Sequence, residues 1–517
     1  MNTRELLLRG GYTRSNDTNR DAHVRVDDVL LEKYGAVPDF SFATLSQFKH
    51  ILSKSGNSVY PRVLEFASTQ DDSHNPFISL SNPSNLSVEP TDTREFAGIP
   101  LVVKDNIDVV GFPTTCGSVD LTDNRPSNDA TLVKRLKSAG FIVCGKTNLT
   151  EFANFYGDRL FHRNTESEYG GITFNAHDTS RTPGSSSCGS AVAVAHGCFP
   201  ASIGSATFGS MILPATYNGV SCIRPTVGLV STNGIAPISN DHDTPGIYAH
   251  SARDCSKILQ IISGKDPTDP WTDVIPNDFN YDALTQHSID REYRITAWYP
   301  TFNDTNQNNL LQPHIDTMLK LLKASGFTTI TTKDFGTITE LNAFNENVYE
   351  SFVNCMHYRF HKDMTMYLEN SNSRIKSVQE LIVAYKVRSK STALWEYSLM
   401  FDDESRYIER RDFVTRTTAD FIENAFSDSD CIVAITRNPA EPLDNLYVYT
   451  TASGSPLSWE LSMLFSVAKC PHVCIPFALF ENLPLTLSIV AKPWKDDVAL
   501  RVADKLQSIL RFFPMPQ

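Results

Sequence analysis

The sequence predicts an α/β protein whose core is a mostly parallel β-sheet, and three observations support this prediction. An apolar run of strand length, Gly98–Val103, is followed by a helical pattern and then by a second apolar run, Phe141–Cys144. The order strand, helix, strand is that of the βαβ unit of parallel sheets. The chain from 266 to 429 is helical and more charged, and a strand run returns at Cys431–Ile435. We therefore expect one α/β core interrupted by a helical region.

The first elements lead up to a lysine at the end of a strand. The first ninety residues contain two helical patterns, 45–52 and 63–69, with polar spacers around them. The run Gly98–Val103 is bounded by Gly and Pro, as buried strands often are, and it is followed directly by Lys104. A buried strand is therefore expected to place this lysine at its end.

A helix is expected between the two strand runs. Asp129 is its expected N-cap, and Gly140 is expected to end it. A final helix is expected to begin near Asp496 or Asp497. The apolar positions of the first helix follow 3,4 spacing: Leu132, Val133, Leu136 and Ala139.

The composition is that of a globular protein with an acidic balance. The chain has 517 residues, of which 41% are hydrophobic, and its 46 Lys and Arg against 59 Asp and Glu give a net charge of −13. This balance argues against general binding to nucleic acid or anionic lipid, which rely on clustered Lys and Arg. No secretory signal and no uncharged apolar stretch of roughly 18 residues is recognised. We therefore expect a cytoplasmic protein without a membrane span.

The ten cysteines are scattered, without paired CxxC sets and without His at zinc spacing. The closest pair, Cys470 and Cys474, lies in an apolar, strand-like stretch. We interpret the cysteines as reduced, buried and hydrophobic, and we expect neither a metal nor another cofactor.

Two loops rich in small residues carry candidate serines. Segment 181–190, Arg-Thr-Pro-Gly-Ser-Ser-Ser-Cys-Gly-Ser, precedes an alanine-rich stretch whose helical N-terminus would supply free N–H groups. Segment 204–210 ends in Ser210 behind a glycine. Neither is a GxSxG elbow, so a nucleophilic serine here needs a base from elsewhere. A serine-rich turn that ends in an N-cap is the alternative interpretation of the first segment.

Lys104 is the candidate base. Burial at a strand end lowers the pKa of a lysine, and a neutral amine can accept a proton from a hydroxyl group. The alternative is a surface lysine paired with the adjacent Asp105.

Together, these segments resemble the amidase signature family of serine hydrolases. Order and spacing agree over residues 96–265, and weakly over 483–506. The segments that carry the resemblance are Gly98–Asp108, Gly145–Ala153, Asn175–Ser190, Gly204–Ala215, Ile223–Leu229 and Asp243–Gly246.

The resemblance implies the amidase signature fold, a large mixed, mostly parallel β-sheet covered by helices on both sides. It divides one structural domain into an N-terminal helical lead-in (1–90), an amidase signature core (91–265), a helical substrate-pocket region (266–429) and a C-terminal part that completes the core (430–517).

The resemblance also implies a Ser–Ser–Lys triad. Ser210 would attack an amide carbonyl, Ser186 on a cis peptide bond would relay the proton, and Lys104 would be the base. Ser187 and Phe208 are expected to contact the substrate, which is a small-molecule amide. A homodimer is a further possibility that the sequence does not decide. Four residues would supply the N–H groups of the oxyanion hole: Thr207, Phe208, Gly209 and Ser210.

The loop before Ser210 departs from the family pattern at two positions. Ala206 stands where the family has an acidic residue, and Phe208 stands where it has a small or acidic one. The ring of Phe208 points either into the acyl pocket or into the core, and we favour the pocket.

Three functions are considered for such a chain. The first is an amidase-type serine hydrolase that cleaves a carboxamide through an acyl-enzyme on Ser210. The second is a biosynthetic acyltransferase on the same triad, in which an amine or alcohol takes the acyl group, and the third is a non-catalytic amidase-like binding protein. We predict the first because all three triad side chains are present.

Overall fold

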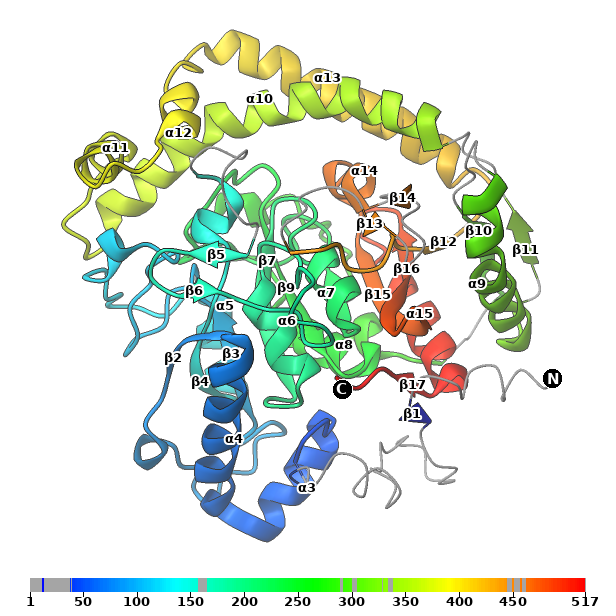
Figure 1. The fold of residues 1–517 in the computed structure, drawn as a ribbon, viewed down its shortest axis with the longest axis horizontal. Helices are drawn as coiled ribbons and strands as arrows, with labels where there is room; N and C mark the ends of the chain where they lie inside the picture. Colours follow the sequence, from blue (N-terminus) through cyan, green and yellow to red (C-terminus); the bar gives the residue numbers. More distant parts are fainter. Residues whose placement is uncertain are drawn as a thin grey trace.

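The computed structural model describes residues 12–13, 38, 40–156, 165–288, 292–299, 305–327, 329–332, 338–443, 449–450, 456–457 and 462–516. Its centre is a β-sheet of 11 strands (Figure 1). From edge to edge the strands are β11 (Thr329–Thr332), β10 (Arg294–Trp298), β12 (Cys431–Ile435), β16 (Leu483–Ala491), β15 (His472–Phe480), β8 (Ser221–Arg224), β9 (Thr244–Ala249), β7 (Ala201–Ala206), β3 (Pro100–Lys104), β4 (Ile142–Thr147) and β2 (Phe77–Leu80).

The sheet is mixed, with a parallel block on each side of an antiparallel centre. Strands β11, β10 and β12 are parallel to their neighbours within one block, and β7, β3 and β4 within the other. From β12 to β7 all neighbours are antiparallel, and β2 is antiparallel to β4 at the edge. The predicted βαβ unit forms one parallel pair, β3 and β4.

The antiparallel centre includes a hairpin that the βαβ pattern does not indicate. Strands β15 and β16 are joined by Glu481 and Asn482, which both have positive φ angles, 48° and 66°. A two-residue loop of this kind joins only antiparallel strands.

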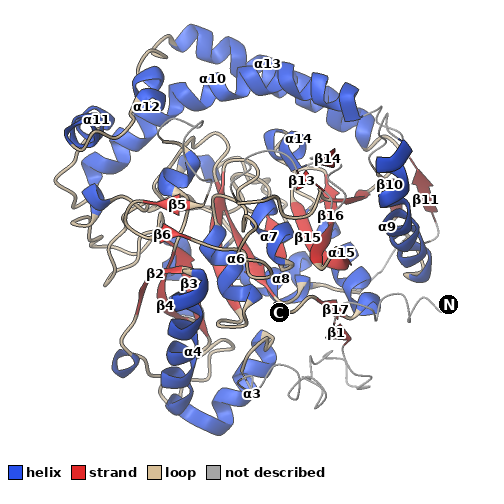
Figure 2. Ribbon diagram, in the orientation of Figure 1, coloured by secondary structure: helices blue, strands red, loops and turns tan. Residues whose placement is uncertain are grey.

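Helices cover both faces of the sheet (Figure 2). Because successive side chains of a strand alternate between faces, Leu101 and Val103 of β3 pack on one side and Val102 on the other. The first side is covered by α5 (Thr131–Ala139), α8 (Ala252–Ile262), α9 (Thr305–Ala324) and α15 (Asp496–Leu510). The second side is covered by α3 (Leu45–Ser55), α4 (Val59–His74), α6 (Cys188–Ala195) and α7 (Ile212–Asn218). The predicted fold class, a large mixed sheet between helices, is confirmed.

The predicted helical region, 266–429, is helical only in part, because its strands β10 and β11 belong to the main sheet. Its helices between 338 and 425 form an arch at one side of the sheet (Figure 1). Its long helices α10 (Ile338–Asn370) and α13 (Glu404–Ala425) lie side by side, and α11 (Val378–Val387) and α12 (Ala393–Ser398) lie near one end. Apolar residues of α10, α11 and α12 pack together with Phe152 and Phe155 of the core segment. The arch is therefore joined to the sheet by an apolar contact of its own.

The remaining elements are short. Helix α14 (Ser462–Val467) precedes β15, and a 3-10 turn covers Glu151–Asn154. Three two-stranded sheets pair β1 (Tyr12–Thr13) with β17 (Phe512–Phe513), β5 (Glu166–Ser167) with β6 (Gly171–Ile172), and β13 (Tyr449–Thr450) with β14 (Pro456–Leu457). No helix within the described ranges has the length and apolar character needed to cross a membrane.

The predicted cap of α5 is wrong, although both helices begin close to their expected positions. Helix α5 begins at Thr131, and the carboxylate of Asp129 instead accepts the N–H of Val110 at 2.8 Å and pairs with Lys137. Helix α15 begins at Asp496, whose carboxylate accepts the N–H and hydroxyl of Thr226 at 2.9 and 2.6 Å. In each case a tertiary partner takes the side chain that could have capped the helix.

Gly140 shows where the fold depends on a missing side chain. It ends α5 with a φ of +109°, and a Cβ there would lie 2.6 Å from the backbone N of Ala97. Gly111, in an exposed turn, has a φ of +100° and no atom within 4 Å of such a Cβ.

We predict that Gly140→Ala lowers the free energy of unfolding by at least about 2 kcal/mol, whereas Gly111→Ala costs about 1 kcal/mol. Both variants place a Cβ on a residue with a similar positive φ, and only Gly140→Ala adds a steric clash. Urea unfolding of the two variants measures the difference. Equal midpoints would show that the contact with Ala97 is not a constraint.

Candidate active site

Lys104 lies at the end of β3 and is completely buried. Its Nζ is 2.8 Å from the Oγ of Ser186, 3.1 Å from the carbonyl oxygen of Ser205 and 3.1 Å from the Oγ of Ser205. The sequence-predicted lysine and the serine-rich loop are therefore in direct contact.

The surroundings of Lys104 favour its neutral form. Burial lowers the pKa of Lys104 to about 7, although Cys188, Asp243 and Cys116 act in the opposite direction. The adjacent Asp105 gives no ion pair to this lysine, because its carboxylate pairs with the buried Lys146 at 3.1 Å. The interpretation of Lys104 as a surface residue paired with Asp105 is thus excluded.

The hydrogen bonds of Lys104 determine where its lone pair can point. A carbonyl oxygen only accepts, so one N–H of the amine must point to the carbonyl oxygen of Ser205. The Oγ of Ser205 also receives the Nδ2–H of Asn106 at 3.0 Å. If the second N–H points to this Oγ, the lone pair of a neutral amine is left for the hydroxyl of Ser186.

The serine-rich loop is held tightly against the start of α7. The peptide bond between Ser185 and Ser186 is cis, as predicted. Gly184 has a φ of +78°, and a Cβ on it would lie 2.8 Å from the backbone N of Pro214. The carbonyl oxygen of Ser186 accepts the N–H of Thr150 at 3.1 Å. Only glycine fits at position 184, and the hydroxyl of Ser186 is fixed in place as a result.

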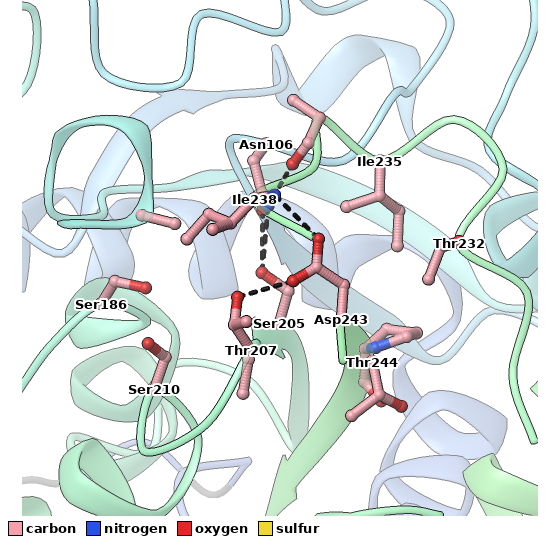
Figure 3. Close-up of a pocket in the computed structure, with 14 residues that line it drawn as sticks. Asn106, Ser186, Ser205, Thr207, Ser210, Thr232, Ile235, Ile238, Asp243 and Thr244 are labelled. Carbon is pink, nitrogen blue, oxygen red and sulfur yellow. Dashed lines mark hydrogen bonds between the residues drawn. The ribbon is translucent and has the colours of Figure 1, made fainter. Parts of the chain in front are cut away.

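Ser187 and Ser210 complete the contacts between the two loops. The Oγ of Ser187 donates to the carbonyl oxygen of Ser205 at 2.9 Å, and its N–H donates to the carbonyl oxygen of Ser210 at 3.4 Å. Figure 3 shows the hydroxyl groups of Ser186 and Ser210 pointing toward each other. The structure therefore places Lys104 in contact with Ser186, and Ser186 and Ser210 beside the same pocket.

The carbonyl groups of the loop before Ser210 all have donors. The carbonyl oxygen of Thr207 accepts from Arg224 at 3.1 Å, and that of Phe208 from Ser466 at 3.2 Å. Gly209 accepts the N–H of Leu213 at 2.9 Å. Within the described part of the chain, no hydrogen bond is found for the N–H groups of the four residues predicted for the oxyanion hole, Thr207, Phe208, Gly209 and Ser210. These N–H groups are therefore available to donate hydrogen bonds to an oxyanion.

The side chain of Phe208 packs against the helical arch. Its ring centroid lies 6.3 Å from that of Tyr349 and 6.0 Å from that of Phe352, both on α10. Ala206 lies in an apolar cluster with Met211 and Tyr248. The two residues that depart from the family pattern thus both have apolar neighbours.

A pocket with an empty volume of about 300 Å³, its open mouth included, lies beside the two serines (Figure 3). Phe208 and Ser187 are not among the residues that line it. The lining residues are Asn106, Ala153, Ser186, Ser205, Ala206, Thr207, Ser210, Thr232, Ile235, Ala236, Ile238, Asp243, Thr244 and Pro245.

Metal-binding side chains are not gathered at this site or elsewhere in the described ranges, where no group of three or more His, Cys, Asp or Glu could hold an ion. All ten cysteines are free and buried. Cys474 lies beside His472 within β15, and Cys470 packs in a separate apolar cluster.

Three residues of the site were not predicted from the sequence: Asn106, Ser205 and Asp243. Asn106 could have been predicted from its position, because a residue two after Lys104 points to the same side of the strand. In the structure both side chains reach the Oγ of Ser205. Asp243 accepts the hydroxyl of Thr207 at 2.6 Å, a contact that no local pattern indicates.

Comparisons with known proteins agree with this geometry. The model of the Amidase family matches residues 74–500. A subunit of the glutamyl-tRNA(Gln) amidotransferase of Sulfurihydrogenibium sp. is 29% identical over 466 residues, which are 88% of this chain and 91% of that protein. The protein of the same name from Persephonella marina is 30% identical over 444 residues, which are 83% of this chain and 87% of that protein.

Solved structures show the same relationship. The native peptide amidase from Stenotrophomonas maltophilia has a TM-score of 0.78 at 26% identity, and the alignment covers 92% of this chain and 98% of that chain. Because the family model spans most of the sequence and the relatives are similar over nearly their whole length, the chain belongs to the amidase family, whose mark is the amidase signature.

Proposed function

We propose that the protein is an amidase-type serine hydrolase that cleaves a carboxamide bond of a small-molecule or peptide-like substrate through an acyl-enzyme on Ser210. The observation that carries this proposal is the contact of 2.8 Å between the Oγ of Ser186 and the Nζ of Lys104, a buried lysine whose pKa is lowered to about 7. The relatives are named as part of an amidotransferase and as a peptide amidase, and these names support action on carbon–nitrogen bonds.

The acylation step uses the three side chains in sequence. As the Oγ of Ser210 bonds to the substrate carbonyl carbon, its proton passes to the Oγ of Ser186, and the proton of Ser186 passes to the neutral amine of Lys104. The carbonyl oxygen becomes an oxyanion that the N–H groups of Phe208, Gly209 and Ser210 stabilise. When the carbon–nitrogen bond breaks, the proton returns through Ser186 to the leaving nitrogen.

Deacylation repeats the same steps with water. Water adds to the acyl carbon while its proton passes through Ser186 to Lys104, and the ester bond to Ser210 then breaks. The proton returns to the Oγ of Ser210, so the enzyme is restored and a carboxylic acid is released.

We predict that Ser210→Ala abolishes labelling by a fluorophosphonate probe and leaves the fold intact, because the change removes one hydroxyl group. Ser138→Ala removes a hydroxyl from an exposed position on α5 and serves as the control. Mass spectrometry of the labelled protein identifies the modified residue. Undiminished labelling of the Ser210→Ala variant would rule out this serine as the nucleophile.

The pH dependence tests the role of Lys104. Because the neutral amine is the active form, the rate of labelling is expected to rise with pH through about 7. Lys104→Arg is expected to be inactive, with a loss of about 10³-fold or more, since a guanidinium group does not release its proton at these pH values. An active Lys104→Arg variant would contradict the proposed base.

The position of Phe208 leads to a third prediction. Phe208→Ala is expected to lower the free energy of unfolding by about 2–3 kcal/mol, because the ring loses its contacts with Tyr349 and Phe352. The ratio of hydrolysis to acyl transfer to an added amine should stay the same. Thermal unfolding and product analysis measure both quantities. A changed ratio without destabilisation would instead place this ring in the acyl pocket.

A further inference from the structure

Asp243 is the carboxylate that contacts the loop before Ser210. It directly precedes β9, and its Oδ1 accepts the hydroxyl of Thr207 at 2.6 Å (Figure 3). Its Oδ2 accepts the backbone N–H groups of Ile238 and Ser239 at 2.8 and 3.0 Å. The carboxylate therefore joins Thr207 to a closed turn, residues 238–243.

Thr207 is held to this turn a second time through its backbone. Arg224 is completely buried, and its Nη2 donates to the carbonyl oxygens of Thr207 at 3.1 Å and His242 at 3.3 Å. Thr207 is thus fixed by its hydroxyl and by its carbonyl group, immediately before the N–H groups of Phe208, Gly209 and Ser210. Ala206, on its other side, has no polar side chain to contribute.

The turn 238–243 is itself attached to both long helices of the arch. The N–H of Asn240 donates to Asp363 of α10 at 3.0 Å. The hydroxyl of Tyr407 on α13 hydrogen bonds to Asp241. A turn with anchors on two other elements is a rigid support for the side chain of Asp243.

We propose that Asp243 is a positioning residue for acyl transfer, which holds Thr207 so that the N–H groups of Phe208, Gly209 and Ser210 face the substrate carbonyl. This inference rests on the proposed function, because it assigns a role in the same reaction. Asp243 acts through Thr207 and does not itself touch the reacting atoms.

The charge of Asp243 provides a second readout, the pH dependence of labelling. Asp243 is one of the groups that raise the pKa of Lys104; the thiols of Cys188 and Cys116 are the others. The carboxyl itself has a pKa raised to about 7, first by burial and also by the nearby Asp363. Removing its negative charge therefore lowers the pKa of Lys104, and the rising limb of the pH profile moves to lower pH.

The experiment measures the rate of fluorophosphonate labelling of Ser210 against pH in the full-length protein and three variants. Asp243→Asn removes the carboxyl group and keeps the shape, and Thr207→Val removes the hydroxyl and keeps the carboxyl group. Ser239→Ala is the matched control, because its hydroxyl is buried in the same turn without a hydrogen-bond partner in the described ranges.

Both site variants are expected to label at least about tenfold more slowly than the unsubstituted protein, and the control at its rate. The double variant should be no slower than the slower single variant, because the two changes break one contact. Asp243→Asn should move the rising limb to lower pH, because it removes the carboxyl group altogether. Thr207→Ser should recover most of the rate that Thr207→Val loses.

Several results would overturn the inference. Unchanged rates in both variants would do so, and so would additive losses in the double variant. If Asp243→Asn does not fold, as judged by thermal unfolding, Thr207→Val with its rescue by Thr207→Ser decides the question alone. Absence of labelling in the unsubstituted protein would refute the proposed function and this inference with it, whereas normal labelling with unaffected variants refutes the inference alone.

Discussion

The site depends on one constraint: Lys104 is completely buried, and its amine can therefore be neutral near pH 7. Its pKa falls from 10.5 to about 7 because burial removes water from the charged form. Between these two values the unfolded chain binds a proton that the folded chain does not, so this lysine opposes folding most below pH 7 and progressively less as the pH rises to 10.5. A group that reduces stability at neutral pH is typical of catalytic sites.

The neighbouring charges are arranged so that this neutral lysine stays unpaired. Consecutive residues at the end of a strand point to opposite sides, so Lys104 and Asn106 reach Ser205, while Asp105 turns away to Lys146. The ion pair of Asp105 and Lys146 satisfies the carboxylate that would otherwise keep Lys104 charged. Lys104 on β3 and Lys146 on the neighbouring β4 are both buried, but only Lys146 has a carboxylate partner. Their partners thus decide that Lys146 forms an ion pair and that Lys104 can be neutral.

The parts of the site that could be predicted from the sequence are those that lie in short motifs. Lys104, Ser186 and Ser210 each lie in a compact motif with recognisable spacing, and the cis bond before Ser186 followed from the same resemblance. The antiparallel centre of the sheet was not predicted, because a βαβ pattern describes only the pairs that it connects. The preference for a pocket position of Phe208 rested on its neighbours in the loop, whereas its ring contacts α10 more than a hundred residues away. The segment boundaries at 90, 265 and 429 stay predictions.

The contacts between the arch and the loop before Ser210 could not be predicted from the sequence, and they share one effect, which is to hold this loop in place. The loop itself is short, and the polar side chains before Ser210, those of Ser205 and Thr207, take their partners from other segments of the chain. Phe208 lies against α10, and Asp243 brings a carboxylate from a turn that α10 and α13 both hold. An oxyanion hole stabilises charge only when its donors are fixed before the reaction. In the proposed mechanism, the contacts of the arch with Phe208 and with the turn that carries Asp243 therefore supply part of the rigidity that these donors need.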